Sequence, residues 1–218
     1  MSTNITVGIV DTGVNNCFSV MQAFNSVGGD VKMIIDSGDM KCFDRLVIPG
    51  VGSYSPAMVH LEEKGLRSEI LDFALSGKPI LGVCLGMQLL MDKSFENGET
   101  LGLGLVSGDV IPISSLLAKD QKKRVPNIGW SEVHVPKAQN SINQINETIA
   151  AKEFYFAHSY TVVASDSDLV VGVVKYSGLP LVAALRQENI LGVQFHPELS
   201  GPNGLRLLTG FLNGDFSS

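Results

Sequence analysis

The first half of the chain alternates short apolar runs with segments of helical periodicity, and this alternation restricts the folds that the chain can adopt. The runs are apolar throughout, which is typical of strands buried on both faces of a sheet. Strands of this kind separated by helices indicate a parallel sheet that helices cover on both sides. The predicted strands are residues 5–10, 31–35, 46–48 and 79–83, and the predicted helices are residues 18–28 and 57–76, with a break at Gly65.

The second half consists mostly of strand-like segments joined by short turns, of which Ser177-Gly178 and Glu188-Asn189 are the clearest. We expect these segments to form hairpins and edge strands beside the parallel strands. No repeat, linker or low-complexity segment divides the chain, so residues 1–218 are expected to form one α/β domain with a mainly parallel central sheet, flanking helices and antiparallel hairpins in the C-terminal half. The predicted strands here are residues 105–113, 130–135, 154–158, 170–175, 181–186 and 190–195, followed by a helix at 203–212.

The composition argues against several classes of function. Of the 218 residues, 44% are hydrophobic and 17% are charged, and the net charge of −6 does not favour binding to nucleic acid or to an anionic membrane. The longest nearly uncharged apolar run, residues 79–91, is shorter than the roughly 20 residues that a membrane span needs. No N-terminal signal segment is recognised and three cysteines cannot all pair, so we expect a cytoplasmic protein. The basic cluster at residues 119–124 is predicted to be a solvated loop, with a partner or phosphate contact as the alternative.

Cys84 stands between two glycines at the junction of a predicted strand and a predicted helix. Gly82, Cys84 and Gly86 follow the spacing of the Gly-x-Ser-x-Gly nucleophile elbow, in which a tight turn leaves no room for flanking side chains. A helix N-terminus favours a thiolate over a thiol, and the N–H of Leu85 is placed to bind an oxyanion. We therefore predict that Cys84 is a nucleophile. The other cysteines, Cys17 and Cys42, are predicted to be small core residues.

A cysteine nucleophile needs a base, and His196 is the best candidate among the four histidines, with His158 as the second. His196 follows an apolar strand, at the end of the sheet where α/β folds place their sites. Pro197 favours an extended conformation at His196, and in an extended segment Glu198 would lie on the same face. A carboxylate so placed orients an imidazole that activates a thiol.

The glycine-rich loop at residues 49–53 also follows a predicted strand. It has no lysine after its glycines, so it is not a phosphate-binding loop, and its backbone N–H groups could supply a second oxyanion donor. The cysteines and histidines are too dispersed for a metal site, and no nucleotide-binding fingerprint is present. We therefore expect neither a metal nor a cofactor.

These segments together resemble the class I (triad) glutamine amidotransferases, whose fold is flavodoxin-like. The resemblance implies that Cys84 attacks the amide of L-glutamine, that His196, oriented by Glu198, transfers the protons, and that the N–H groups of Val51 and Leu85 form the oxyanion hole. It further implies that the Gly50–Val51 peptide reorients on activation. The segments that carry the resemblance are residues 49–52, 82–88 and 194–198, and the residues implied to hold the substrate are Gly50, Gly52, Gln88, Glu96, Ser159 and Tyr160.

Further segments are similar to one branch of this family, the glutaminase subunits of imidazole glycerol phosphate synthases. That similarity implies a heterodimer with a (β/α)8-barrel cyclase subunit that receives the ammonia and makes imidazole glycerol phosphate and AICAR in histidine biosynthesis, with Trp130 and Tyr155 near the interface and ammonia route. Core packing is an equal alternative for Trp130. The segments concerned are residues 11–13, 126–130, 154–160 and 200–208.

Two residues depart from that branch's pattern: Asn127 stands where histidine is common, and Leu199 where a basic residue is common. We expect both to lie away from the reacting groups and to bear on the choice of partner. A paralogous glutaminase for surface-sugar amidation is therefore one alternative. A stand-alone cysteine hydrolase and a non-catalytic binding module are further alternatives, which the His-Pro-Glu segment and the intact Cys84 disfavour.

Overall fold

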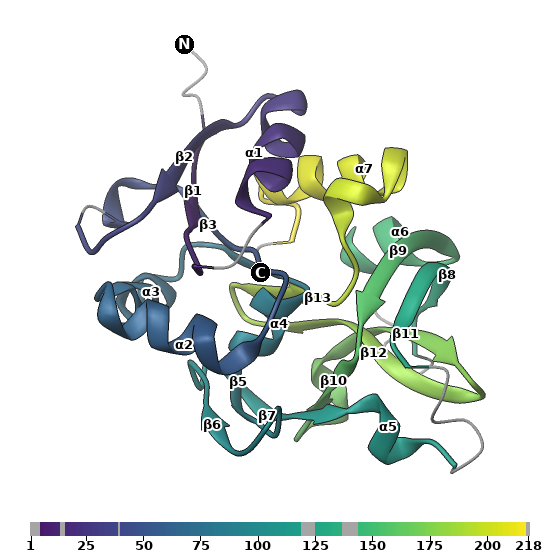
Figure 1. The fold of residues 1–218 in the computed structure, drawn as a ribbon. Coiled ribbons are helices and arrows are strands. Elements are labelled where there is room, and N and C mark those ends of the chain that lie inside the picture. The colour runs from purple at the N-terminus through teal and green to yellow at the C-terminus, as the bar shows by residue number, and fades with distance from the viewer. Residues whose placement is uncertain (1–4, 14–15, 39, 119–124, 137–143, 217–218) are drawn as a thin grey trace.

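The structure is a computed structural model, and it describes residues 5–13, 16–38, 40–118, 125–136 and 144–216. These residues form a nine-stranded sheet, ordered β2-β1-β3-β4-β13-β12-β11-β8-β9, and a four-stranded sheet, ordered β10-β7-β5-β6 (Figure 1). The predicted α/β class is confirmed. The basic cluster at residues 119–124 lies outside the described residues.

Five neighbouring strands at one side of the large sheet run parallel. They are β2 (Asp30–Ile34), β1 (Thr6–Val10), β3 (Arg45–Ile48), β4 (Ile80–Val83) and β13 (Ile190–Val193). The residues of β1, β3, β4 and β13 are almost all buried, as apolar strands with helices on both faces must be, whereas β2 at the sheet edge buries only Ile34.

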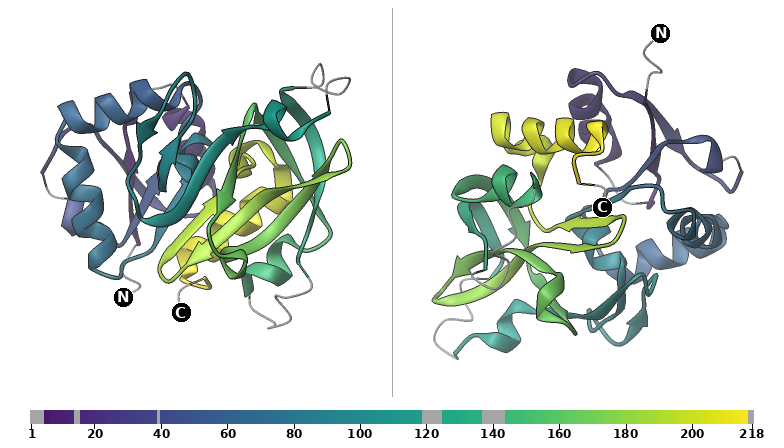
Figure 2. Two further views of the ribbon diagram at one scale, coloured as in Figure 1. Left: turned by 90° about the horizontal axis from the view of Figure 1, so that it is seen from below. Right: turned by 180° about the vertical axis from the view of Figure 1, so that it is seen from behind.

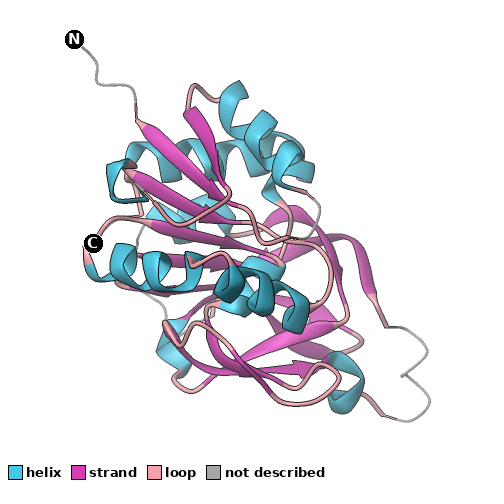
Figure 3. Ribbon diagram, turned by 60° about the vertical axis from the view of Figure 1, so that its left-hand side comes forward, coloured by secondary structure: helices cyan, strands magenta, loops and turns pink. Residues whose placement is uncertain are grey.

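Helices cover both faces of these strands (Figure 3). On one face, α1 (Cys17–Ser26) and α7 (Gly201–Asn213) share one apolar cluster with the sheet, and α6 (Gln144–Ile149) extends this cluster against α7 and the strand at Val170–Tyr176. Figure 2 shows α7, in yellow, beside α1, in purple. On the other face, α2 (Tyr54–Glu63) and α3 (Leu66–Leu75) belong to a second cluster, and Gly65 separates them at the predicted break.

The remaining strands of the large sheet are antiparallel. They are β12 (Leu179–Gln187), β11 (Val170–Tyr176), β8 (Asn127–His134) and β9 (Lys152–His158). The antiparallel pairing of the C-terminal half is confirmed, with one correction. The strand at Ile190–Val193 is not an edge strand, because it lies between β4 and β12 and pairs parallel to β4.

The four-stranded sheet consists of short elements that the sequence pattern did not reveal, apart from β7. Its strands are β5 (Met91–Ser94), β6 (Thr100–Leu101), β7 (Val106–Pro112) and β10 (Tyr160–Ala164). The chain passes from the large sheet to the small one between β9 and β10, at Ser159. The other short elements are α4 (Leu85–Leu89), α5 (Ile113–Leu116) and the one-turn helices η1 (Met40–Cys42), η3 (Ser167–Leu169) and η4 (Pro197–Leu199).

No helix in the described part of the chain is long and apolar enough to cross a membrane.

Candidate active site

Three neighbouring parallel strands, β3, β4 and β13, end at the same edge of the sheet. The glycine-rich loop follows β3, Cys84 follows β4, and His196 lies three residues beyond the end of β13. The backbone N–H of Cys84 donates to the carbonyl of Val193 over 2.8 Å. Segments 110 residues apart in the sequence therefore meet because their strands pair.

Cys84 occupies the predicted turn between β4 and α4, in a backbone conformation that side chains rarely adopt. Its φ of 53° and ψ of −107° place it outside the common regions. Such strain costs on the order of 1–3 kcal/mol and persists only where the surroundings enforce it. Both flanking glycines permit the tight turn, because a Cβ at Gly86 would lie 1.6 Å from the carbonyl oxygen of Ile48, and one at Gly82 would lie 2.8 Å from the backbone nitrogen of Met87.

His196 is buried beside Cys84, and its two ring nitrogens have different partners. Nδ1 lies 2.9 Å from Oε1 of Glu198, and the other side-chain hydrogen bond of the ring is to Cys84. Burial opposes the charged ring, but the hydrogen bonds to Cys84 and Glu198 outweigh it and raise the pKa of His196. The imidazole is therefore prepared to hold a proton.

Glu198 reaches His196 by a different local structure from the one predicted. The strand ends at Val193, and Glu198 lies in the one-turn helix η4, which begins at Pro197. His196 itself is extended, with φ −100° and ψ 95°. The pair therefore forms across the start of a tight turn, and the expectation of a continuous extended segment is wrong.

Asn16, at the start of α1, is a further contact of Glu198 that the sequence did not indicate. Its side-chain Nδ2 donates to the same carboxylate oxygen that faces His196. The Glu198 side chain is fully buried. Asn16 lies 182 positions away in the sequence, so no local pattern could have linked the two residues.

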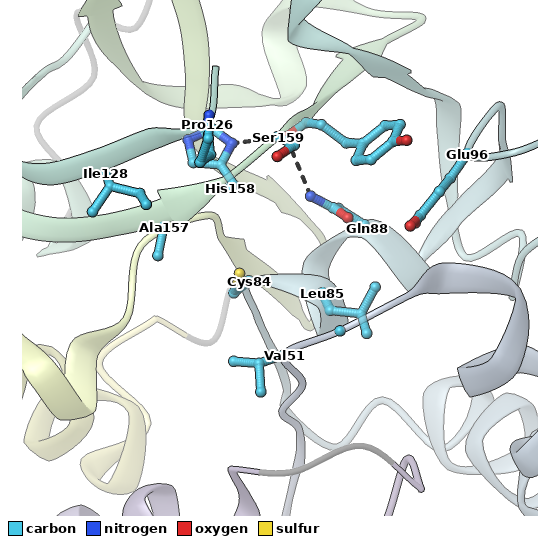
Figure 4. Close-up of a pocket in the computed structure, with 12 residues that line it drawn as sticks. Val51, Cys84, Leu85, Gln88, Glu96, Pro126, Ile128, Ala157, His158 and Ser159 are labelled. Carbon is cyan, nitrogen blue, oxygen red and sulfur yellow. Dashed lines mark hydrogen bonds between the residues drawn. The ribbon is translucent and has the colours of Figure 1, made fainter. Parts of the chain in front are cut away.

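A pocket of about 320 Å³ opens in front of Cys84 (Figure 4). It contains most of the residues that the family resemblance assigned to substrate. Gln88 and Glu96 lie on the same side of Cys84, and one oxygen of Glu96 accepts a hydrogen bond from the Tyr54 N–H over 2.9 Å. The lining residues are Val51, Gly52, Cys84, Leu85, Gln88, Glu96, Pro126, Ile128, Ala157, His158, Ser159 and Tyr160.

The two expected oxyanion donors lie beside this pocket, but one of them is engaged. The N–H of Leu85 donates to the carbonyl oxygen of Gly50 over 3.3 Å. Val51, whose N–H belongs to the same peptide as that carbonyl, lines the pocket. In this conformation the Gly50–Val51 peptide presents an acceptor to Leu85, so Leu85 has no free N–H for a ligand.

His158 forms part of the pocket wall and is held in one tautomer. Its Nδ1 lies 2.7 Å from the carbonyl oxygen of Tyr160, which only accepts, so Nδ1 carries the proton. Its Nε2 then accepts from Asn127, 2.9 Å away. Burial, opposed by the Tyr160 carbonyl and aided by the nearby His196, lowers the pKa of His158 to about 4. A neutral His158 without a thiol contact is a wall residue, whereas His196 contacts Cys84.

Asn127 is buried behind His158 and, as expected, lies away from the reacting groups. It touches no reacting group, but it supports a residue that lines the pocket. Leu199, in contrast, is 48% exposed and lies at the surface.

Trp130 and Tyr155 lie outside the pocket lining. They are cross-strand partners on β8 and β9, with ring centroids 6.0 Å apart in an edge-to-face arrangement. Trp130 is 54% exposed, so core packing is not its role. The backbone carbonyl of Tyr155 accepts from the N–H of His196 over 2.9 Å, which links β9 to the segment that carries His196.

The remaining cysteines and histidines lie apart from Cys84. Cys84 is buried, whereas Cys42 is exposed at the end of η1 and Cys17 is half-buried at the start of α1. The prediction of a core residue is therefore wrong for Cys42, which η1 turns outward on the surface, whereas Cys17 packs against the apolar cluster beneath α1. Among the described residues, no group of three or more His, Cys, Asp or Glu side chains could hold a metal ion.

Residues 9–213 match the model of the family described as glutamine amidotransferase class-I. The chain therefore belongs to the class-I glutamine amidotransferase family and is an enzyme of that class. Its solved structural relatives agree on the fold: the structure of PurLQS from Thermotoga maritima covers 97% of this chain and 99% of its own, with a TM-score of 0.74 and 22% identity.

Within that class, the chain is similar to curated proteins named imidazole glycerol phosphate synthase subunit HisH. The HisH of Wolinella succinogenes is 39% identical, over 94% of this chain and 98% of its own length. The HisH of Desulfitobacterium hafniense is 37% identical, over 94% of this chain and 92% of its own length.

Proposed function

We propose that this chain is the glutaminase subunit of an imidazole glycerol phosphate synthase, with Cys84, His196 and Glu198 as its catalytic triad. The observation that carries the proposal is the contact of one buried imidazole with both the Cys84 thiol and the Glu198 carboxylate, beside a pocket of about 320 Å³ that Cys84 lines. The HisH relatives support the choice of synthase.

In the proposed reaction, the sulfur of Cys84 attacks the side-chain amide carbon of L-glutamine. His196 takes the thiol proton and passes it to the leaving ammonia, so the C–N bond breaks and a glutamyl thioester remains. His196 then takes a proton from water, which attacks the thioester and releases glutamate and the free thiol. Glu198 holds the imidazole in the required tautomer and stabilises its charged form.

The oxyanion of each tetrahedral intermediate is proposed to bind the N–H groups of Leu85 and Val51. Rotation of the Gly50–Val51 peptide would withdraw the carbonyl that Leu85 now contacts and turn the Val51 N–H toward the pocket, so one motion would supply both donors. The family resemblance implies such a reorientation on activation. In the conformation described here the site is consistent with a resting state.

The substrate is proposed to be held by residues around the pocket in front of Cys84. Glu96 supplies a carboxylate for the α-ammonium group, while Gln88, Gly50 and Gly52 and the backbone of Ser159 and Tyr160 contact the remaining polar atoms. All of these residues line the pocket except Gly50, whose carbonyl lies at its edge on Leu85.

The partner is proposed to be a (β/α)8-barrel cyclase in the cytoplasm, bound as a heterodimer and supplied with ammonia from this site. The exposed apolar side chains of Ile128, Trp130 and Leu199 near the pocket fit an interface of this kind. Residues 1–218 are proposed to act as one glutaminase domain. A paralogous glutaminase for surface-sugar amidation is the second candidate, because Leu199 is uncharged at the position where the synthase branch commonly has a basic residue.

Glutamate release by the isolated chain and by the chain bound to candidate barrel cyclases tests the proposal. We expect weak turnover alone, strong turnover in the complex, and conversion of the histidine-pathway intermediate by that complex. Strong hydrolysis of unrelated amides or peptides without a partner would favour a stand-alone hydrolase. Glutamine turnover in a complex that leaves the histidine-pathway intermediate unchanged would favour the paralogue.

A further inference from the structure

Gln194 is a fully buried side chain beside Cys84 to which the proposed chemistry assigns no role. It follows β13 directly, next to the turn that carries Cys84. One end of its amide lies 3.6 Å from the sulfur of Cys84, and the other end lies 3.1 Å from the side-chain amide of Gln88. Which end is nitrogen decides whether the sulfur meets a donor or an acceptor.

The carbonyl oxygen of Tyr160 settles this orientation. A backbone carbonyl only accepts hydrogen bonds, and the Gln88 amide lies 3.3 Å from it, so Gln88 must direct Nε2 toward Tyr160. The second N–H of that nitrogen then donates to Gln194, which must present Oε1. Nε2 of Gln194 is left facing Cys84, as a donor.

The opposite assignment leaves two acceptor oxygens in contact. If Gln88 were reversed, its oxygen would face the Tyr160 carbonyl, which already accepts from Nδ1 of His158. Reversing Gln88 alone would lose both of its hydrogen bonds. Reversing both amides would keep a bond between them but lose the bond from Gln88 to Tyr160 and leave two buried acceptor oxygens facing each other. Both N–H groups of Gln88 are thus engaged within the protein, and Gln88 can offer a substrate only its oxygen.

We propose that Gln194 is a catalytic residue whose side-chain amide donates a hydrogen bond to the sulfur of Cys84 and stabilises its thiolate form. A sulfur with a negative charge accepts hydrogen bonds more strongly than a neutral thiol, so a fixed donor favours the thiolate. The ring of His196 makes the other side-chain hydrogen bond to this sulfur. The thiolate would therefore accept from two side chains, and these two contacts would fix the direction from which it attacks. The inference rests on the proposed function only for the identity of the nucleophile.

The test measures how fast iodoacetamide alkylates Cys84 between pH 5 and pH 10, with mass spectrometry to separate Cys84 from the other two cysteines. Gln194→Met removes the donor at similar size, and Gln194→Glu keeps the shape but places an oxygen against the sulfur. We expect the pH of half-maximal rate to rise by about one pH unit in Gln194→Met and further in Gln194→Glu. Gln187→Met, in β12 and half-buried, is the matched control and should leave the profile unchanged.

Other titratable groups near Cys84 are present in every variant, so they cancel in the comparison: His196, Glu198, Glu96, His158 and Tyr160. Far-ultraviolet circular dichroism identifies folded variants, and the isosteric Gln194→Glu keeps the test available if Gln194→Met does not fold. An unchanged profile in a folded variant would overturn the inference. The assay uses no glutamine, so a failure of the proposed glutaminase function would not affect its outcome.

Discussion

His158 gives the protein a dependence of stability on pH that can be worked out from its surroundings. The ring is buried, neutral and bonded at both nitrogens, and its pKa falls from 6.5 to about 4 on folding. Between these two values the unfolded chain binds the proton and the folded chain does not, so stability decreases as the pH falls through this range. A shift of this size makes the folded state about 2 kcal/mol less stable at pH 5 than at pH 7.

Urea unfolding at pH 7 and pH 5 measures this term when the protein is compared with His158→Gln. From pH 7 to pH 5, the free energy of unfolding should fall by about 2 kcal/mol less in the variant than in the original chain. This difference does not depend on the variant's stability at pH 7. The raised pKa of His196 has the opposite effect on stability. Its contribution to the free energy of unfolding is complete below pH 6.5 and is lost as the pH rises through the pKa of the folded protein. His196 is present in both proteins, so its contribution cancels in the comparison. His134→Gln, at a half-exposed ring, is the control. An equal loss in His158→Gln and in the original chain would refute the reasoning.

Three further substitutions test the turn, the triad and the substrate wall. Gly86→Ala should lower the free energy of unfolding by about 3 kcal/mol or more in urea, because the added methyl group meets a backbone carbonyl, while Gly38→Ala, with open space around it, should change little. Asn16→Ala removes a donor from the buried Glu198 and should lower kcat about tenfold in a glutamate-release assay on folded protein; an unchanged kcat would contradict this role. Glu96→Gln should raise the KM for glutamine about tenfold or more and change kcat less, and the reverse split would contradict a binding role.

Much of the fold follows from local patterns, but its exceptions have a common cause. The apolar runs that became β1, β3 and β4 are long enough and uniform enough to identify buried parallel strands. The strand at Ile190–Val193 has the same apolar character, and only its long-range pairing with β4 shows that it is central. β6, with two residues, carries too little periodicity to be found, and β10 begins only two residues after β9 ends, so no turn signal separates the two strands in the sequence.

The residues of the site also divide into those that local sequence patterns identify and those that only long-range contacts reveal. Cys84 could be predicted as the nucleophile because the glycines on either side of it meet a local steric requirement of the turn. At Gly86 this requirement comes from the carbonyl oxygen of Ile48, with which a Cβ would clash. Asn16 and the orientation of Gln194 could not be predicted, because each depends on a partner more than 100 positions away in the sequence. The position of Asn127 behind His158 likewise depends on the pairing of β8 with β9.

The central claim is that Cys84 carries the glutaminase chemistry, and one comparison tests it directly. Glutamate release is measured for the complex of the chain with its cyclase partner and for the same complex carrying Cys84→Ala. The account predicts that the substitution abolishes glutamine turnover while the complex still forms and still makes product when ammonia is supplied. Glutamine turnover that survives in the Cys84→Ala complex would contradict it.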